Sequence, residues 1–369
     1  MESEEMTGEE LDFAPRLPQG PAPAIAVCGA GGIVNDAHLP AYAKAGFEVA
    51  GIFDRQRERA EATAARFGIG KVYGSLEELA ADPAAGVVDV AVPADENEAV
   101  VGALAGRGKA VLLQKPLSED LDGARRIVEL LRRGGTVAAV NQQMRWEPGV
   151  RACRGLIEKG MLGEIYSISF LIFVDTPWHM WPWLASKESI DVLYHSIHYL
   201  DAIRFLCGAA PEAVYCGGGG YPGFEARGET RICLHLHFAG HLRASVLTNH
   251  HAAYGLEGQQ SEFRVEGSEG AVVRRLGLLM DYPQGAPDAF RYKTKGGAWS
   301  EADFGATWFP DAFVGPMASL MRARAGEIER PETDVADNLK TLELVFGAMR
   351  SMRQRQVQEL GGSAGPSPA

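Results

Sequence analysis

The sequence predicts an α/β Rossmann domain followed by an α+β domain that contains a large, mostly antiparallel open sheet. In the first half, short apolar runs alternate with helical stretches, which is typical of a parallel, doubly wound sheet. In the second half, longer strands follow one another with turn residues between them, which favours antiparallel pairing. We expect the domains to cover residues 22–145 and 146–355, between disordered tails at 1–21 and 356–369.

The elements of the first domain are predicted from buried apolar runs and from helical stretches rich in Ala, Glu and Arg. A helical stretch through Tyr42 follows the first strand and its glycines. The predicted strands are 24–28, 48–53, 87–92, 110–113 and 136–140, and the other helices are 55–67, 97–106 and 118–133.

The second domain is predicted from runs that follow one another without helices between most of them. Ala239 and Gly240 form the turn of a hairpin. The predicted strands are 165–174, 213–217, 231–238, 242–248 and 262–266, and the helices are 190–206 and 334–355.

Composition excludes several classes of protein. The 369 residues are 46% apolar and 23% charged, with a formal net charge of −12 and no basic stripe, so we expect no nucleic-acid partner. No apolar run reaches the roughly 18–20 residues of a membrane span, and the acidic start lacks the features of a secretory signal. Five cysteines without a CxxC pair indicate reduced thiols in a cytoplasmic protein.

A glycine-rich turn follows the first strand and opens a helix, which is the context that a dinucleotide-binding fingerprint requires. Gly29 allows the tight turn, and Gly31 lets the backbone approach a pyrophosphate at the helix N-terminus. The third glycine position of the fingerprint holds Val34. The alternative interpretation is an ordinary loop.

Asp54 ends the second strand, where an acid accepts hydrogen bonds from the adenosine ribose hydroxyls. A carboxylate there repels a 2′-phosphate, so we expect NAD rather than NADP, with the adjacent Arg55 weakening the preference. The alternative role of Asp54 is that of a helix N-cap.

Titratable groups concentrate in the predicted helix after Ser189. Tyr194 and His198 are four residues apart and share one face, while Asp191 and His195 share the next. Histidine titrates near neutrality and suits proton transfer with a hydroxyl. The alternative is core histidines that bond the backbone.

Lys115 follows the fourth strand, in the crevice where such sheets bind ligands. The alternative is an ordinary solvated lysine. A second group of candidates is aromatic: Trp178, Trp181 and Trp183, with His179 among them, predict a loop near the active-site mouth that packs on sugar rings. The alternative is an aromatic subunit contact or core plug.

Four further residues are candidates to join this substrate site: Arg145, Trp146, Asp191 and His195. The five histidines at positions 235, 237, 241, 250 and 251 lack a spaced acid or cysteine, so we expect no metal and place them on the open sheet face, at a subunit interface.

Residues 22 to about 355 resemble the glucose–fructose oxidoreductase, inositol dehydrogenase and MocA family. Seven motifs together carry the resemblance: GAGGI and HLP within 29–40, IFDRQRERAEATAARFG at 52–68, AVP at 91–93, QKPLS at 114–118, RWEP at 145–148, GEI at 163–165, and HYLDAIRFLCG at 198–208.

The resemblance implies specific roles. The family's EKP lysine matches Lys115, which lies beside the nicotinamide and the reacting hydroxyl in that family, and its DxGxH histidine matches His198. The chain departs from the family pattern at four positions, where it holds Gln114 for the glutamate of EKP, Tyr194 for the acid, Ser196 for the glycine, and Asn97 for a common histidine. The expected cofactor-binding residues are Gly29, Gly31, Gly32, Ile33, Asp54, Arg55, Pro93, Asn97, Gln114 and Lys115.

The predicted function is therefore NAD-dependent transfer of a hydride between a secondary alcohol or ketone of a sugar, cyclitol or glycoside and the nicotinamide. Lys115 polarises the hydroxyl, His198 acts as general base, and Tyr194 extends the relay or bonds a neighbouring hydroxyl. Two alternatives remain: a reductase of a non-sugar substrate, and an NAD-sensing regulator of the same fold. We expect a homodimer or homotetramer that pairs through the open sheet.

Overall fold

A computed structural model describes residues 11–361, which form two compact units. The parallel-sheet unit consists of Ala14–Glu147 and Ala306–Leu339. The open-sheet unit consists of Pro148–Gly305 together with residues 340–361 and 11–13. The predicted boundary at residue 145 is close to the first division, but the chain returns to the first unit after residue 305, which the sequence analysis did not predict.

The parallel-sheet unit confirms the predicted Rossmann domain. Among the described residues its sheet has five strands in the order β2-β1-β3-β4-β5, all parallel. An isolated parallel bridge between Ile52 and Val72 extends the sheet past β2. The order reverses between β1 and β3, which is where such sheets bind ligands. The strands are β1 Ala24–Cys28, β2 Val49–Phe53, β3 Ala85–Val90, β4 Ala110–Gln114 and β5 Ala138–Asn141.

Helices connect these strands. Two helices of this unit, α3 and α9, were not predicted. The first begins after Ser75, whose hydroxyl accepts a hydrogen bond from the Glu78 backbone N–H at 3.1 Å, a capping arrangement present in the sequence. The α-helices of this unit are α1 Leu39–Ala45, α2 Arg57–Phe67, α3 Leu76–Ala81, α4 Asn97–Leu104, α5 Leu121–Arg133 and α9 Val314–Arg324. Short helical turns cover Val34–His38, Ala94–Glu96, Gln143–Trp146 and Asp311–Phe313.

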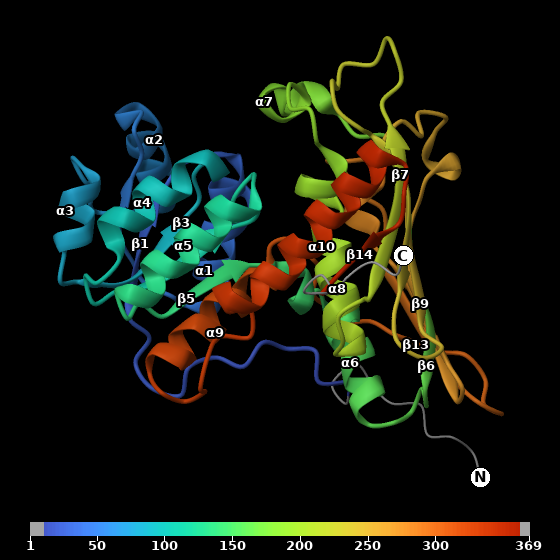
Figure 1. The fold of residues 1–369 in the computed structure, drawn as a ribbon. Helices are drawn as coiled ribbons and strands as arrows, with labels where there is room; N and C mark the ends of the chain where they lie inside the picture. The colour runs from blue at the N-terminus through green and yellow to red at the C-terminus, as the bar shows by residue number, and fades with distance from the viewer. Residues whose placement is uncertain (1–10, 362–369) are drawn as a thin grey trace, which may run out of the picture. The chain divides into compact units, whose positions relative to one another are not determined.

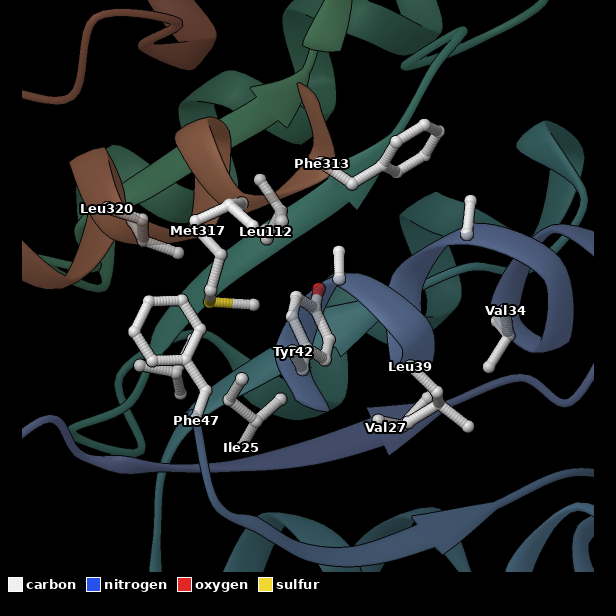
Figure 2. Packing of buried hydrophobic residues seen from close by; sticks show 14 of the residues in the cluster. Ile25, Val27, Val34, Leu39, Tyr42, Phe47, Leu112, Phe313, Met317 and Leu320 are labelled. Carbon is white, nitrogen blue, oxygen red and sulfur yellow. The ribbon is translucent and has the colours of Figure 1, made fainter. Parts of the chain in front are cut away.

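The core of this unit explains why α9 belongs to it. Figure 2 shows Met317 and Leu320 of α9 packed with Tyr42 of α1 and with Ile25 and Leu112 of the sheet. Both α9 side chains have no exposed surface, and burial of each stabilises the unit by about 2 kcal/mol. Sequence periodicity cannot show which sheet a distant helix covers, so the predicted boundary was wrong here.

The open-sheet unit confirms the predicted second domain. Among residues 11–361 its sheet has nine strands in the order β13-β12-β11-β10-β6-β9-β8-β7-β14. Every neighbouring pair is antiparallel except β6 and β9, which are parallel. The strands are β6 Ile165–Phe173, β7 Ala213–Gly219, β8 Arg231–His237, β9 Arg243–Asn249, β10 Gln260–Gly267, β11 Gly270–Arg275, β12 Ala289–Thr294, β13 Ser300–Ala302 and β14 Gln358–Glu359.

Helices cover one face of this sheet, as Figure 1 shows for α8 and α10. In β8 the residues alternate, so that Ile232, Leu234 and Leu236 are buried toward the helices while Cys233 and His235 are exposed on the other face. The helices of this unit are α6 Pro148–Glu158, α7 Pro182–Ala185, α8 Ile197–Cys207 and most of α10 Val335–Gln354, and further helical turns cover Trp178–Met180, Asp191–His195, Leu256–Gly258 and Gly277–Leu279.

The predicted tails are wrong in part. Leu11 is buried, and the Phe13 ring packs on Phe304 at a centroid distance of 4.8 Å. At the other end, Gln358–Glu359 pairs with β7. Apolar contact and strand pairing therefore order both segments, while residues 1–10 and 362–369 lie outside the described range. None of the described helices is both long and apolar enough to cross a membrane.

Candidate active site

The turn after β1 has the geometry that a dinucleotide needs. Gly29 has a φ of +113°, and a Cβ there would lie 2.3 Å from the Ala91 carbonyl oxygen, so only glycine fits. A Cβ at Gly31 would meet nothing within 4 Å, so the backbone at the start of the helix is open to a ligand. Helix N-termini of this kind bind phosphate through their free N–H groups.

Asp54 lies just past the end of β2, as predicted, and it also braces the turn. Its Oδ2 accepts a hydrogen bond from the Ala30 N–H at 2.8 Å, and its Oδ1 accepts one from the Gln56 N–H at 2.8 Å. The residue lines a cavity of about 350 Å³ together with Arg55 and Tyr73. Because a carboxylate can accept more than two hydrogen bonds, these contacts leave it able to bind ribose hydroxyls. The residues present therefore fit NAD.

The neighbouring cofactor candidates have structural contacts of their own. Arg55 forms an ion pair with Glu96 at 2.8 Å. Asn97 is buried, and its side-chain amide donates to the Leu117 carbonyl at 3.0 Å, which ties α4 to the loop that carries Lys115. Pro93 precedes the turn Ala94–Glu96. Gly32 stands in the open turn, and Ile33 packs partly against the core.

Lys115 follows β4 and is half-buried. Burial lowers the pKa of its ammonium group to about 8, because the charged form loses hydration. Its backbone N–H donates to the Gln114 side-chain oxygen at 2.7 Å. An amine with a pKa near neutrality can hold or exchange a proton at an alcohol oxygen, which suits the predicted role.

In the open-sheet unit the predicted helix begins with a different geometry. Residues Asp191–His195 form a π-helical turn, in which the Ser196 N–H donates to the Asp191 carbonyl at 2.6 Å, before α8 begins at Ile197. Asp191 is the first residue of this turn, and its Oδ1 accepts a hydrogen bond from the Ser196 hydroxyl at 2.6 Å. Glu229 holds the turn by accepting from the Val192 N–H at 3.2 Å.

Asp191 is the centre of a buried polar cluster. Its Oδ2 lies 3.5 Å from His250 Nε2 and accepts a hydrogen bond from the Thr248 hydroxyl. Burial alone raises the pKa of the carboxyl, but the imidazole of His250 and the hydroxyls of Ser196 and Thr248 outweigh it, so the pKa lies below its usual range. His250 Nδ1 in turn contacts the Thr176 hydroxyl at 2.8 Å. Asp191 is therefore an anion at neutral pH.

Three predicted substrate residues meet at this cluster. The ring centroid of His195 lies 4.8 Å from that of His250 and 5.8 Å from that of Trp178. Trp178 also lies 5.7 Å from His250. The structure thus brings Asp191, His195 and Trp178 together, with His250 between them.

His250 is the residue that the sequence analysis misplaced. It was predicted on the open sheet face, but only 3% of it is exposed. The alternation that buries Val246 and Thr248 on β9 continues past the end of the strand to position 250, and this signal was available in the sequence. His235 and His237 are exposed, as predicted. Residues 11–361 contain no group of three side chains arranged for a metal ion.

The tryptophan segment forms helical structure rather than the predicted loop. Trp178–Met180 is a 3₁₀ turn and Pro182–Ala185 is the short helix α7. Trp178 is buried, whereas Trp183 is 53% exposed and meets the Tyr194 ring edge-on at 5.7 Å. Trp181 packs on Tyr282 at 5.3 Å.

A cavity of about 380 Å³ opens beside this segment. Its wall combines aromatic rings with carboxylates and includes Trp178 and the predicted residue His179. The indole Nε1 of Trp178 is buried and has no hydrogen-bond partner among the described residues. The other residues that line the cavity are Asp175, Thr176, Pro177, Gly223, Phe224, Glu225, His251, Ala253, Gln259, Asp281 and Tyr282.

Tyr194 and His198 are both buried in the open-sheet unit. Lys115 belongs to the parallel-sheet unit, so the joint action of Lys115 and His198 on one hydroxyl stays a prediction.

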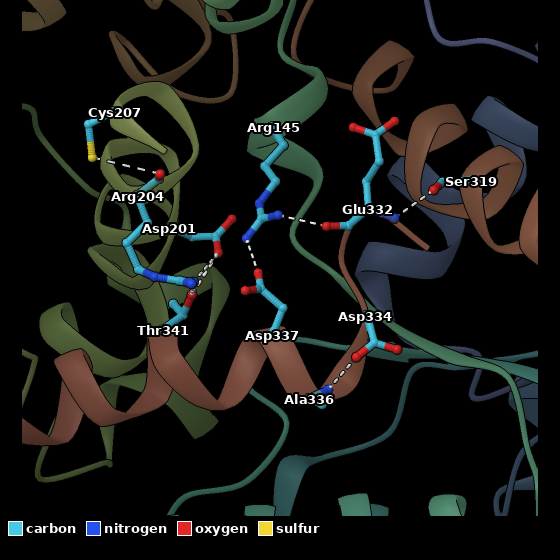
Figure 3. A network of polar contacts seen from close by, with 10 residues as sticks. All are labelled: Arg145, Asp201, Arg204, Cys207, Ser319, Glu332, Asp334, Ala336, Asp337 and Thr341. Carbon is cyan, nitrogen blue, oxygen red and sulfur yellow. Dashed lines mark hydrogen bonds and ion pairs between the residues drawn. The ribbon is translucent and has the colours of Figure 1, made fainter. Parts of the chain in front are cut away.

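Two predicted substrate residues have structural contacts instead. Figure 3 shows Arg145 donating to the Glu332 carbonyl at 2.7 Å and to the Asp337 carboxylate at 3.0 Å. Trp146 is buried where a Cβ on Gly315 would meet its indole ring at 2.1 Å. A position next to a family motif does not show whether the Arg145 guanidinium already has partners within the protein. Because Arg145 and Trp146 both have such contacts, we leave them out of the proposed substrate site.

Two protein-family models match the chain. A model described as an oxidoreductase family with an NAD-binding Rossmann fold matches residues 24–142. A model described as a GFO/IDH/MocA C-terminal domain matches residues 150–273. The two matches lie in sequence on either side of the first division between the units.

Individual relatives agree with these models. A 1,5-anhydro-D-fructose reductase of Ensifer adhaerens is 29% identical over 67% of this chain and 74% of its own. A D-apiose dehydrogenase of Paraburkholderia graminis is 26% identical over 88% of this chain and 86% of its own. The fold matches that of an oxidoreductase from Agrobacterium radiobacter solved with NAD⁺, L-tartaric acid and magnesium, with a TM-score of 0.79, 22% identity, and coverage of 92% of this chain and 98% of that one.

Proposed function

The chain belongs to the glucose–fructose oxidoreductase, inositol dehydrogenase and MocA family of NAD-binding oxidoreductases, and from this premise we propose that it oxidises a secondary alcohol of a sugar, cyclitol or glycoside reversibly. The observation that carries the proposal is Lys115. It follows the fourth strand of a dinucleotide-binding sheet, half-buried, and burial lowers its pKa to about 8. That position and protonation behaviour suit a group that holds a reacting hydroxyl.

Each residue of the proposed site has a separate role. The turn at Gly29 and Gly31 binds the pyrophosphate, and Asp54 accepts the ribose hydroxyls. NAD, when bound, supplies the hydride acceptor. Lys115 holds the substrate oxygen, and the hydroxyl proton passes to His198 as the hydride leaves the carbinol carbon. Tyr194 extends this relay or bonds a neighbouring hydroxyl.

The cavity beside Trp178 supports a hydroxyl-rich substrate. Aromatic faces at Trp178 and Phe224 suit the C–H faces of a sugar ring, while the carboxylates of Asp175 and Glu225 can accept hydrogen bonds from hydroxyl groups. We propose that this cavity binds a part of the substrate remote from the oxidised carbon.

A second candidate function is supported by one observation. Tyr194 stands where the family has an acid, which favours a protein that senses NAD without catalysing a reaction. A protein that only senses NAD needs no lysine whose charged form is disfavoured by burial. Lys115 is such a lysine, so it supports the enzyme function over the sensor function.

We also propose a homodimer or homotetramer that pairs through the exposed face of the nine-stranded sheet. A row of side chains in register crosses this face from Tyr215 through His235 and Ser245 to Ser169. The proposed compartment is the cytoplasm, which the five free thiols support, since a reducing environment keeps cysteines unpaired.

The test is a panel of sugars, cyclitols and glycosides assayed for NADH formation, with aromatic diols as the non-sugar arm. We expect turnover of at least one sugar-like alcohol. Lys115→Ala should lower kcat by about a hundredfold or more at nearly unchanged NADH affinity, while Lys295→Ala, at an exposed lysine, serves as the matched control. Full activity of Lys115→Ala would refute the assigned role, and wild-type protein that binds NADH but turns over no alcohol would favour the sensor.

A further inference from the structure

A buried network of polar side chains joins β3, the first helix and the end of β4 in the parallel-sheet unit. Asp89 on β3 and His38 at the start of the first helix have no exposed surface. His38 Nδ1 lies 2.7 Å from Asp89 Oδ2. On the other side of the ring, His38 Nε2 lies 3.2 Å from Gln114 Nε2 and 3.2 Å from Asn141 Nδ2.

The donors and acceptors in this polar network determine which nitrogen of His38 carries the proton. A carboxylate only accepts, so the proton between Asp89 and His38 belongs to Nδ1 of the imidazole. Nε2 of a neutral imidazole then accepts, and the amide nitrogens of Gln114 and Asn141 supply the donors. A second proton on Nε2 would face two N–H groups. Neutral His38 is therefore the form that satisfies every contact.

The same arrangement orients Gln114. Its amide nitrogen turns toward His38, so its oxygen turns the other way and accepts the backbone N–H of Lys115 at 2.7 Å. This contact anchors the residue that carries the proposed catalytic amine. The chain of contacts thus leads from a buried carboxylate, through an imidazole and an amide, to the backbone of Lys115.

We propose that His38 is a positioning residue that acts through Gln114 to hold Lys115 in its working position. The proposal rests on the function proposed for Lys115 above. An ionised glutamate at position 114 could not donate to Nε2 as the amide of Gln114 does.

Burial of Lys115 supports this inference. The pKa of Lys115 falls to about 8 because its side chain is held where the charged form loses hydration. A lysine released from this position would regain water and a higher pKa.

Tyr42 and Cys28, two titratable groups packed near His38, stay neutral near pH 7. Tyr42 on α1 donates its hydroxyl to Asp89 at 2.8 Å, and burial with the Asp89 charge raises its pKa far above the usual value. Burial, with the charges of Asp54 and Asp89, raises the pKa of Cys28 on β1 to about 12. The Phe313 ring, 5.1 Å from His38, and the Asn141 amide carry no charge.

The first experiment uses His38→Leu in the full chain without cofactor, because a lysine that leaves its position regains water and a higher pKa. Lysines are dimethylated with ¹³C, the Lys115 signal is identified by its loss in Lys115→Arg, and its pKa is followed by NMR. We expect the pKa to rise by about one unit, and the alkaline limb of the kcat profile to move by the same amount. An unchanged Lys115 titration in a folded variant that binds NADH would overturn the proposal.

The second experiment compares three replacements of His38. His38→Gln can offer an acceptor to Gln114, His38→Asn keeps only the contact with Asp89, and His38→Leu removes both. We expect kcat to fall by about 10- to 100-fold in the Leu variant, to recover most in the Gln variant, and KM to change little. Equal losses in all three variants, in proportion to their unfolding temperatures, would show a merely structural role. The NMR titration needs no substrate, so it separates failure of this proposal from failure of the proposed function.

Discussion

Lys115, which is half-buried, and Asp191, which is fully buried, differ in how their surroundings shift the pKa. Around Lys115 burial is the dominant effect on the pKa, which falls to about 8. Around Asp191 a histidine and two hydroxyls outweigh burial and keep the carboxyl ionised. The first group can change its charge near neutral pH and so can take part in proton transfer, whereas the second is a fixed anion that orients its neighbours.

The first prediction at this scale concerns stability. Replacing Lys115 with Met should stabilise the protein at pH 7 by on the order of 1 kcal/mol, because folding no longer buries an ammonium group. Below pH 8 the wild-type lysine is charged in both the folded and the unfolded state. The full difference in the free energy of unfolding between the two proteins is therefore present. Between pH 8 and about 10.4 the folded lysine is already neutral while the unfolded one still binds a proton, so wild-type stability rises and the difference shrinks.

Urea unfolding of both proteins from pH 7 to pH 10 measures this difference. Lys295→Met, at a lysine that is 70% exposed, is the matched control and should show no such pH dependence. A Met variant that is less stable than wild type at pH 7 would contradict the buried charge.

The second residue-scale prediction concerns cofactor choice. Wild-type protein should bind NAD at least about tenfold more tightly than NADP, because the Asp54 carboxylate repels a 2′-phosphate. Asp54→Ala should narrow that difference, and fluorescence titration with both cofactors measures it. The variant also loses the contact with the Ala30 N–H at 2.8 Å, so its unfolding must be measured alongside. Tighter binding of NADP by wild type would refute the assignment and would identify Arg55 as a phosphate ligand.

At the scale of the element, the two special turns owe their shape to different causes. The turn after β1 is dictated by glycine, since a side chain at Gly29 would strike the backbone of Ala91. The π-helical turn at Asp191–His195 is held by its surroundings, because Glu229 and Ser196 bond its backbone and side chains. Downstream, Thr341 on α10 joins Asp201 and Arg204 of α8 through bonds of 2.7 and 2.6 Å (Figure 3).

The element-scale prediction contrasts two glycines of the β1 turn. Gly29→Ala should destabilise the protein by about 2 kcal/mol or more, because the left-handed backbone and the close carbonyl both oppose a Cβ. Gly31→Ala should leave stability within about 0.5 kcal/mol, since its Cβ meets nothing within 4 Å, yet it should weaken NADH binding. Thermal unfolding and NADH titration separate the two effects. Unimpaired NADH binding by a folded Gly31→Ala protein would show that the cofactor does not approach there.

At the scale of the whole molecule, the main feature is the exposed face of the nine-stranded sheet. Folding of a single chain leaves this face without helices that cover it. Tyr215 is 40% exposed on it. Tyr215 and His235 are direct partners across β7 and β8, and Ser245 bonds Ser169 at 3.1 Å in the same row. A flat face with aromatic and small polar side chains suits a self-complementary contact between two copies.

The corresponding prediction is a change of assembly. Tyr215→Glu combined with His235→Glu should shift the protein toward monomer, because like charges would meet across a two-fold interface. Light scattering after size-exclusion chromatography measures the mass. Tyr254→Glu, at a loop tyrosine that is 87% exposed, is the control and should keep the wild-type mass. An unchanged mass in the double variant would place the interface elsewhere.

Several features of this protein were determined by the sequence alone. The alternation of strand and helix, the glycine turn at Gly29, the acid at Asp54 and the alternating strands of the second sheet all follow from local periodicity and backbone geometry. Each depends on residues close together in the chain, so a single sequence contains the whole signal.

Other features were decided only by tertiary structure. The return of α9 to the first sheet, the placement of His250 beside Asp191 and the burial of Arg145 all join segments far apart in sequence; Thr248 and Asp191, for example, are 57 residues apart. Local propensity is equally compatible with many such pairings, and packing of the complete core selects one of them. The π-helical turn belongs to this group too, because the Glu229 that holds it comes from a distant part of the chain.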